Sequence, residues 1–127
     1  GDSVSAFRKI DVLVHAAVHE SFGRVYYEAG AAGRPIISCD SLVARRAIVN
    51  SVNGFLVSSK HPKDMAEKMM QLTCQESVFR MGMSAHEIIT KEFSDELVGE
   101  RIYSAYLNAA KARRSQQGFL SCLKKML

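Results

Sequence analysis

The chain has 127 residues, of which 47% are hydrophobic and 24% charged, and this composition is typical of one globular domain rather than of a disordered chain. Its apolar runs are too short for a membrane-spanning helix, and no secretory signal pattern opens it. The chain begins Gly-Asp-Ser without a starting Met, so we interpret it as a processed or cut piece of a longer protein.

The net charge of +4 is distributed unevenly along the chain. Residues 111–127 carry five basic and no acidic side chains, whereas the other residues carry twelve basic and thirteen acidic ones. A nucleic-acid-binding domain spreads positive charge over a face, so we expect no nucleic-acid partner. Residues 111–127 are interpreted as a basic helical tail after a domain of residues 1–110. Three interpretations of this tail are open: peripheral contact with an anionic membrane, contact with a missing domain, and disorder.

Three widely spaced cysteines, at positions 39, 74 and 122, predict reduced and mostly buried thiols in a cytoplasmic protein. The four histidines do not cluster at metal-ligand spacing. His19-Glu20 resembles the opening of the zinc-protease motif, but the position of its second histidine holds Gly23. We therefore predict no metal site.

Strands and helices alternate in the first half of the chain. One or two helical turns in residues 3–9 precede the run DVLV, which predicts a strand buried on both faces, as in a parallel sheet. A helix at residues 24–32 stops at Gly33-Arg34-Pro35. The following predicted elements are a buried strand at 35–39, a brief helix at 44–49 and, after an Asn-Gly turn, a strand at 54–57.

Helical patterns occupy the second half. The predicted helices begin at Pro62, cover about residues 77–91 and run from a cap at Ser94 to Ala109. The methionines between Met65 and Met83 are interpreted as core packing, and the residues predicted on or near one helix face are Phe79, Met83, His86 and Ile89. The whole order predicts an α/β fold, a Rossmann-like three-layer parallel sheet with helices on both faces. Three strands are few for this fold, so the chain looks like the back half of something larger.

The loop at residues 16–23 is the predicted ligand site, because ligands of open α/β sheets bind beyond the carboxyl ends of the strands. The helix that begins near Arg24 presents unpaired amides from about Phe22 to Val25, and its dipole favours a phosphate or diphosphate. Gly23 lacks a side chain and so lets an oxygen atom approach the backbone closely.

Two acidic residues, Glu20 and Glu28, flank this predicted anion site. A carboxylate accepts two hydrogen bonds at once, which suits the neighbouring hydroxyls of a ribose or a hexose. Glu28 lies one turn inside the helix and suits a ribose, whereas Glu20 suits the sugar on the far side of the phosphates. The pattern indicates a nucleoside-diphosphate sugar, although solvated charges near a helix start explain the spacing alone more often.

Longer motifs resemble a known family. Residues 20–29 read ESFGRVYYEA, residues 31–37 read AAGRPII and residues 52–57 read VNGFLV. Further similarity lies in Arg80-Met81-Gly82 with Ala85 and in Phe93-Ser94. Together these motifs resemble the C-terminal, donor-binding domain of the retaining glycosyltransferases of family 4 (glycosyl transferases group 1), which have the two-domain GT-B architecture. The similarity covers roughly residues 7–107.

The resemblance implies the donor-binding part of an enzyme that transfers a hexose from a nucleoside-diphosphate sugar, such as UDP- or GDP-hexose, to an unknown acceptor. Glu28 would bind the ribose, and Glu20 would contact the transferred sugar and face its developing positive charge. The residues that would line the diphosphate and sugar are Ser21, Phe22, Gly23, Arg24 and Val25. No metal or other cofactor is implied. The N-terminal GT-B domain would be missing, so we expect the isolated chain to be inactive.

The chain departs from the family pattern after the second strand. Where the family has Gly-Gly-x-x-Glu, residues 42–46 read LVARR, so Leu42 and Val43 are expected to reshape or narrow the site and Arg46 reverses a charge. Gly30 replaces a Met of the family, at a cost of about 1 kcal/mol in helix propensity relative to Ala. These changes motivate an alternative, a non-catalytic nucleotide-sugar-binding or interaction module that has diverged from the family.

Several side chains near the loop allow two interpretations. Arg24 is either a diphosphate ligand or a residue of the helix surface. One of the adjacent Tyr26 and Tyr27 is expected to pack inward rather than stack on a base. His19 either bonds a sugar hydroxyl or lies exposed. Capping of the next helix is the expected role of the polar residues Ser38, Asp40 and Ser41.

Overall fold

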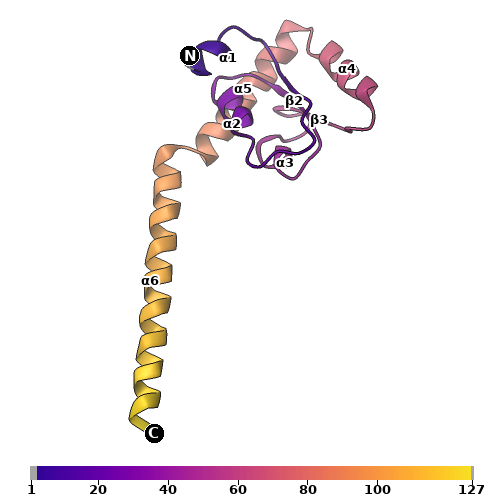
Figure 1. Cartoon of the computed structure of the whole chain (residues 1–127). Helices are drawn as coiled ribbons and strands as arrows, with labels where there is room; N and C mark the ends of the chain where they lie inside the picture. Colours follow the sequence, from indigo (N-terminus) through magenta and orange to yellow (C-terminus); the bar gives the residue numbers. More distant parts are fainter. Residues whose placement is uncertain (1–2, 127) are drawn as a thin grey trace. The chain divides into compact units, whose positions relative to one another are not determined.

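A computed structural model describes residues 3–126, with side chains described for residues 5–109 and 111–113 (Figure 1). The strands are β1 (Leu13–His15), β2 (Ile36–Cys39) and β3 (Gly54–Val57). The helices are α1 (Ser3–Phe7), α2 (Arg24–Ala31), α3 (Ala44–Ala47), α4 (Pro62–Gln71), α5 (Gln75–Glu92) and α6 (Asp95–Met126). The chain divides into two compact units, one ending at Glu92 and one beginning at Phe93.

The strands form a parallel sheet in the order β1-β2-β3, which confirms the predicted α/β class. Leu13 pairs with Ile36, and Ile37 pairs with Phe55. Gly54 permits the close approach of β3 to β2, because a Cβ atom at this residue would fall 2.1 Å from the carbonyl oxygen of Ile36. The buried Asn53 holds the preceding turn, as its side chain accepts from the amide of Val49 at 2.7 Å and donates to the carbonyl of Ala47 at 2.8 Å.

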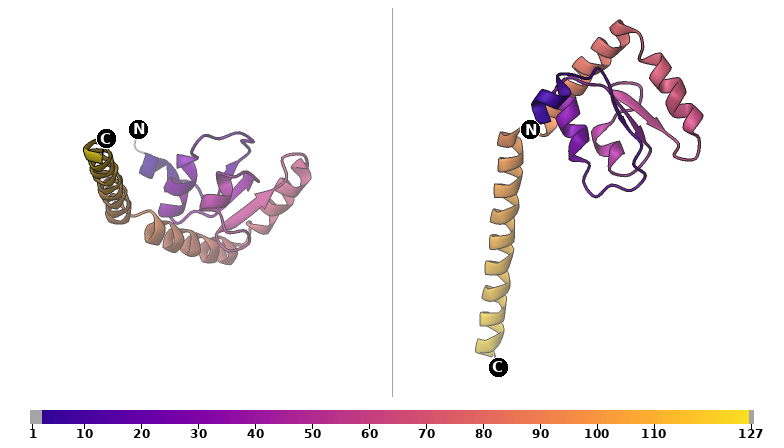
Figure 2. Two further views of the ribbon diagram at one scale, coloured as in Figure 1. Left: turned by 90° about the horizontal axis from the view of Figure 1, so that it is seen from below. Right: turned by 45° about the horizontal axis from the view of Figure 1, so that its top comes forward.

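Helices cover both faces of the sheet, as Figure 2 shows. Side chains alternate between the faces of a strand, and the fully buried β2 displays this alternation. Ile37 belongs to a core cluster with Leu72, next to the end of α4, whereas the adjacent Ser38 bonds to Tyr26 of α2. The central strand thus packs against α4 on one side and α2 on the other.

The prediction that the first strand is buried on both faces is wrong for β1. Its residues are half-buried or exposed, and Val14 belongs to the exposed large hydrophobic residues. The reason lies in the sheet order, since β1 forms an edge of the described sheet and pairs with β2 alone. An apolar run predicts the strand but not its place in the sheet.

Helix α2 stops as its sequence predicts. Gly33 adopts the left-handed conformation with φ 70°, and its amide donates to the carbonyl of Gly30 at 2.9 Å. The amide of Arg34 donates to the carbonyl of Ala29, also at 2.9 Å. This pair of bonds is the Schellman motif, which satisfies carbonyl groups that the helix leaves unpaired. The stop redirects the chain through Pro35 into β2.

The interpretation of the methionines as core packing is wrong for several of them. Met81 is buried and Met65 packs against the core, but Met69, Met70 and Met83 are exposed. On α5 the buried residues are Met81, Gly82, Ala85 and Ile89, whereas Phe79 and Met83 of the predicted face point outward. The buried face of α5 is thus the one with small residues, where Gly82 lies against Gly33 after α2 and Ala85 lies near Gly30 of α2.

Helix α6 continues through the predicted last helix and the tail as one backbone helix, Asp95–Met126. Ser94 caps it, as predicted, because its Oγ accepts from the amide of Leu97 at 3.2 Å. In the predicted tail the side chains of Lys111 and Arg113 are exposed, whereas those of residues 114–127, including Cys122, lie outside the described ones. Within the described residues no helix is long and apolar enough to cross a membrane.

Candidate functional site

The loop between β1 and α2 lies at the carboxyl edge of the sheet, where the predicted site was placed. Because the strands are parallel, the segments that follow β1 and β2 leave the sheet at the same edge. A bond joins them, since the Sγ of the buried Cys39 donates to the carbonyl of Ala16 at 3.4 Å. The loop of residues 16–23 is therefore anchored to the central strand.

Gly23 turns the chain into α2 and opens the start of this helix. It has φ 70°, and a Cβ atom there would fall 2.6 Å from the Tyr26 ring and 2.9 Å from Cγ1 of Val43. The helix has no side-chain cap and no acidic residue in its first turn. Its first amides are thus not bound by a capping side chain, and the anion site itself stays a prediction.

Glu20 is held by a residue that the sequence interpretation did not single out. Its Oε2 lies 3.1 Å from Nε2 of His15, the last residue of β1, and each of the two side chains is 28% exposed. An ionised carboxylate only accepts hydrogen bonds, so Nε2 carries the hydrogen of this contact. A histidine at the carboxyl end of a strand, five residues before a candidate acid, is the sequence signal for this pair.

His15 packs on a buried, hydrogen-bonded pair of side chains, Tyr26 and Ser38. Its ring lies edge-on to the ring of Tyr26, with centroids 5.2 Å apart and planes at 78°. The Tyr26 hydroxyl lies 2.9 Å from Oγ of Ser38, and both residues are fully buried. Burial chiefly raises the pKa of Tyr26, and the nearby charge of Glu20 also raises it, so this phenol stays protonated at neutral pH. Tyr26 is thus the inward-packing tyrosine of the predicted pair.

Glu28 pairs with Arg24 one turn earlier on α2. Nη2 of Arg24 donates to Oε1 of Glu28 at 3.1 Å, with the arginine side chain 80% exposed and the glutamate 33% exposed. An exposed pair at this helical spacing contributes only about 0.3–0.5 kcal/mol. A ligand hydroxyl can therefore replace the guanidinium at little cost.

The remaining predicted residues lie near the same helix start. Ser21, Phe22 and His19 are exposed, and Val25 is half-buried. The Phe22 ring lies over Tyr27, with centroids 5.6 Å apart. The exposed position of His19 matches one of its two interpretations.

The segment after β2 combines capping with the departures from the family pattern. The Ser41 Oγ accepts from the amide of Ala44, the first residue of α3, at 3.1 Å, although the N-cap position itself is Val43. The capping role expected for Ser38 is wrong, because its Oγ bonds Tyr26 and the carbonyl of Cys39. Asp40 instead binds Arg45 through two hydrogen bonds of 2.6 and 2.7 Å, and this guanidinium holds the pKa of the Asp40 carboxyl below its usual value. Leu42 is 82% exposed, whereas Val43 lies against Gly23, and the expected narrowing of the site stays a prediction.

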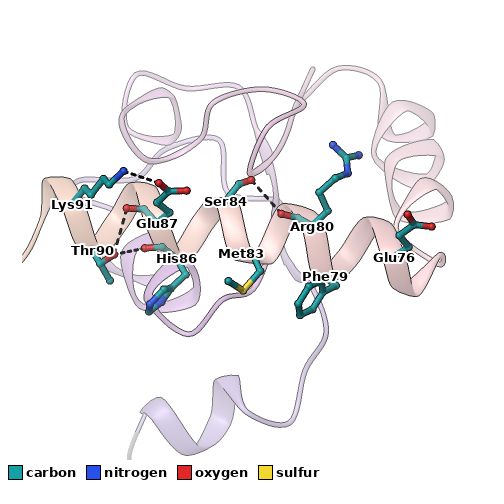
Figure 3. Close-up of a pocket in the computed structure, with 9 residues that line it drawn as sticks. All are labelled: Glu76, Phe79, Arg80, Met83, Ser84, His86, Glu87, Thr90 and Lys91. Carbon is teal, nitrogen blue, oxygen red and sulfur yellow. Dashed lines mark hydrogen bonds and ion pairs between the residues drawn. The ribbon is translucent and has the colours of Figure 1, made fainter.

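A depression also lies elsewhere, along the outer face of α5. It has a volume of about 740 Å³, and all of its lining residues come from this one helix (Figure 3). Several of its polar side chains bond within the helix, as in Lys91 with Glu87 at 2.6 Å and Ser84 with the carbonyl of Arg80 at 3.2 Å, whereas Nδ1 of His86 lies 2.7 Å from the carbonyl oxygen of Ala31 in α2. One helix face does not bring polar groups from several elements together, as ligand sites do.

The thiols and possible metal ligands in the described residues form no second site. Groups of His, Cys, Asp and Glu suited to a metal ion are absent from the described part of the chain. Cys39 is buried and Cys74 exposed, so the expectation of buried thiols fails for Cys74. Cys74 precedes α5, where hydrogen bonds from the Ser77 and Glu76 amides hold the pKa of its thiol below the usual value.

The chain belongs to the family described as glycosyl transferases group 1, whose model matches residues 1–88. A capsular polysaccharide biosynthesis glycosyltransferase of Staphylococcus aureus, CapM, is 30% identical over 83% of this chain and 28% of its own length. A D-inositol 3-phosphate glycosyltransferase of Paenarthrobacter aurescens is 40% identical over 54% of this chain and 17% of its own length. The chain therefore matches less than a third of the length of these relatives.

Solved structures share the fold. A mutant of TarM from S. aureus, solved in complex with Fondaparinux, alpha-GlcNAc-glycerol and UDP, superimposes with a TM-score of 0.75 at 25% identity, over 84% of this chain and 21% of TarM. Sucrose-phosphate synthase of Thermosynechococcus elongatus superimposes with a TM-score of 0.79 at 20% identity, over 84% of this chain and 27% of its own. These neighbours are GT-B glycosyltransferases, so the sheet is part of a GT-B fold.

Proposed function

We propose that the chain is the donor-binding part of a retaining family 4 glycosyltransferase that transfers a hexose from a nucleoside-diphosphate sugar. The uncapped start of α2, with Glu20 on one side and Glu28 on the other, carries this proposal. The family match supports it, as does the UDP in the complex of the similar TarM. The proposed protein works in the cytoplasm, takes an acceptor of unspecified kind and needs no metal ion or other cofactor.

The α2 start would bind the diphosphate. Amides at Gly23, Arg24 and Val25, with the helix dipole, stabilise negative charge, and this charge grows as the bond between sugar and diphosphate breaks. The acceptor oxygen bonds the anomeric carbon from the face that the diphosphate leaves, and its proton passes to the departing diphosphate oxygen. Glu20 stabilises the positive charge that develops on the sugar ring.

Glu28 would accept hydrogen bonds from both ribose hydroxyls. Its Oε1 is bound to Arg24 in the free chain, and the exposed guanidinium moves readily because its long side chain is solvated. Arg24 released from Glu28 is free to contact the diphosphate. The two roles considered for Arg24 then correspond to the free and the bound chain.

One observation favours a second candidate, a diverged nucleotide-sugar-binding module without transfer activity. Val43 stands where the family has glycine and lies beside Gly23, the residue at which the sequence predicts that a ligand oxygen approaches the backbone. A valine there leaves less space at the predicted diphosphate site than a glycine would. The exposed Arg46 adds a positive charge where the family has an acid.

Calorimetric titration of the chain with UDP, GDP and ADP tests the proposed donor site. One nucleotide should bind, and Glu28→Ala should weaken it at least about tenfold, because two hydrogen bonds to a charged acceptor are worth more than about 1.4 kcal/mol. Glu67→Ala is the matched control, since it removes an exposed carboxylate of α4.

Failure of all three nucleotides to bind would call for the same titration with the full-length parent protein. If the parent protein also bound none of the three nucleotides, the transferase proposal would be overturned. Binding by the parent together with no transfer from any nucleotide sugar would favour the diverged module.

A further inference from the structure

His15 contacts both Glu20 of the candidate site and the buried residue Tyr26. It lies outside the family motifs quoted above. It ends β1, lies 3.1 Å from Glu20 and packs edge-on against Tyr26. Tyr26 is in turn bonded to Ser38 of β2 at 2.9 Å. One side chain thereby links the loop carboxylate to two strands and a helix.

The support beneath His15 is rigid. Tyr26 and Ser38 are fully buried, and Ser38 also donates to the carbonyl of Cys39 at 3.2 Å. A ring that packs on a buried aromatic residue has few alternative rotamers, so the position of Nε2 is set by the core. The loop before α2 lies at the surface, where a glutamate without such a contact samples several rotamers.

The contact engages one carboxylate oxygen of Glu20. Oε2 accepts from His15, which leaves Oε1 to accept from hydroxyl groups of a sugar. The contact also limits the rotamers of Glu20 and so restricts the direction of its negative charge. A misplacement of about 1 Å in such a group can lower a rate about 100-fold.

We propose that His15 is a positioning residue for the transfer reaction, which orients the Glu20 carboxylate toward the transferred hexose through its Nε2. This inference rests on the proposed function, because it assumes that Glu20 contacts the sugar of a nucleoside-diphosphate hexose. His15 itself touches neither sugar nor nucleotide.

Four substitutions separate positioning from packing. His15→Phe keeps an aromatic ring against Tyr26 but removes the donor, whereas His15→Gln keeps a nitrogen donor near Nε2 and loses the ring. His15→Ala removes both. His61→Ala is the control, because His61 is an exposed imidazole whose side chain does not cap α4. Thermal unfolding of each variant identifies any that fail to fold.

The first readout is donor hydrolysis by the full-length parent protein, with UDP-glucose, GDP-mannose and ADP-glucose as probes. His15→Ala and His15→Phe should lower kcat about 10- to 100-fold with KM changed less than about threefold, and His15→Gln should recover most of the rate. In a Glu20→Ala background, His15→Ala should change kcat less than about threefold, since its effect passes through Glu20. Recovery by Phe instead of Gln, or equal losses in both backgrounds, would overturn the proposal.

The second readout needs no ligand. Long-range ¹⁵N spectra of the folded chain report the His15 ring nitrogens, and Glu20→Ala should shift Nε2 while leaving the His61 signals in place. An unchanged His15 signal would overturn the inference alone. A shifted signal in a parent protein that binds none of the nucleotides would overturn the proposed function and, with it, the positioning role.

Discussion

Gly23 shows how much one residue decides at this site. Its φ of 70° disfavours any side chain, and the Tyr26 ring and Val43 occupy the space where a Cβ atom would lie. Glycine adopts this turn, which presents the α2 amides, without the strain that a side chain would add. Sequence reasoning assigned Gly23 a role in ligand approach, whereas the structure adds a second role in packing.

We expect Gly23→Ala to lower the free energy of unfolding by about 2–4 kcal/mol, because left-handed strain and crowding add. Gly33→Ala is the matched control, with the same φ of 70° but its nearest new contact at 3.8 Å, and should cost only about 1–2 kcal/mol. Urea unfolding of both variants measures the difference. Equal losses would show that Tyr26 and Val43 move aside.

At the scale of the elements, the packing of α5 on the rest of its unit depends on small residues. A Cβ atom on Gly82 would fall 2.3 Å from the carbonyl oxygen of Gly33, which is backbone and cannot rotate away. Gly30 likewise admits Ile89 to the surface of α2, where a Cβ atom would lie 2.6 Å from Cγ1 of Ile89. The loss of helix propensity expected for Gly30 thus accompanies close helix contact.

We expect Gly82→Ala to lower the free energy of unfolding by about 1–3 kcal/mol through overpacking against the α2–β2 turn. Gly99→Ala in α6 provides the comparison, since a Cβ atom there meets nothing within 4 Å. It should raise helix content, because alanine is favoured over glycine by about 0.8–1.0 kcal/mol in a helix. Thermal unfolding followed by circular dichroism checks both, and a neutral Gly82→Ala would contradict close packing at Gly33.

The elements themselves were predictable where the signals are local. Gly33 and Pro35 end α2, Pro62 begins α4, and Asn53 precedes β3, which Gly54 begins, all as the sequence predicts. The sequence did not predict which face of α5 is buried, because Phe79 and Met83 repeat at helical spacing as well as Met81 and Ile89 do. Small residues that allow close approach decided which face is buried.

On the scale of the molecule, the buried hydrophobic residues of the core lie between Phe7 and Ile89. The unit ending at Glu92 therefore contains this core, and the family match, residues 1–88, also falls within it. We expect a chain that ends at Glu92 to unfold cooperatively, with Tm within about 4–8 °C of the longer chain, the shift that about 1 kcal/mol produces in a domain of this size.

Scanning calorimetry of the two chains measures that shift. A loss of cooperativity, or a much larger fall in Tm, would show that residues after Glu92 stabilise the first unit. Binding of the nucleotide by the shorter chain would further locate the donor site within the first unit, where Glu20 and Glu28 lie.

Local sequence patterns placed the strands, the helix stops and the loop with its two acids, because turn residues and apolar runs act over a few neighbouring positions. The family motif then assigned roles to Glu20 and Glu28. Only the tertiary structure revealed the exposed edge of β1, the contact of Val43 with Gly23 and the link from Glu20 through His15 to Tyr26 and Ser38. These depend on sheet order and on how α2 packs against the sheet, which bring together residues that no short pattern connects.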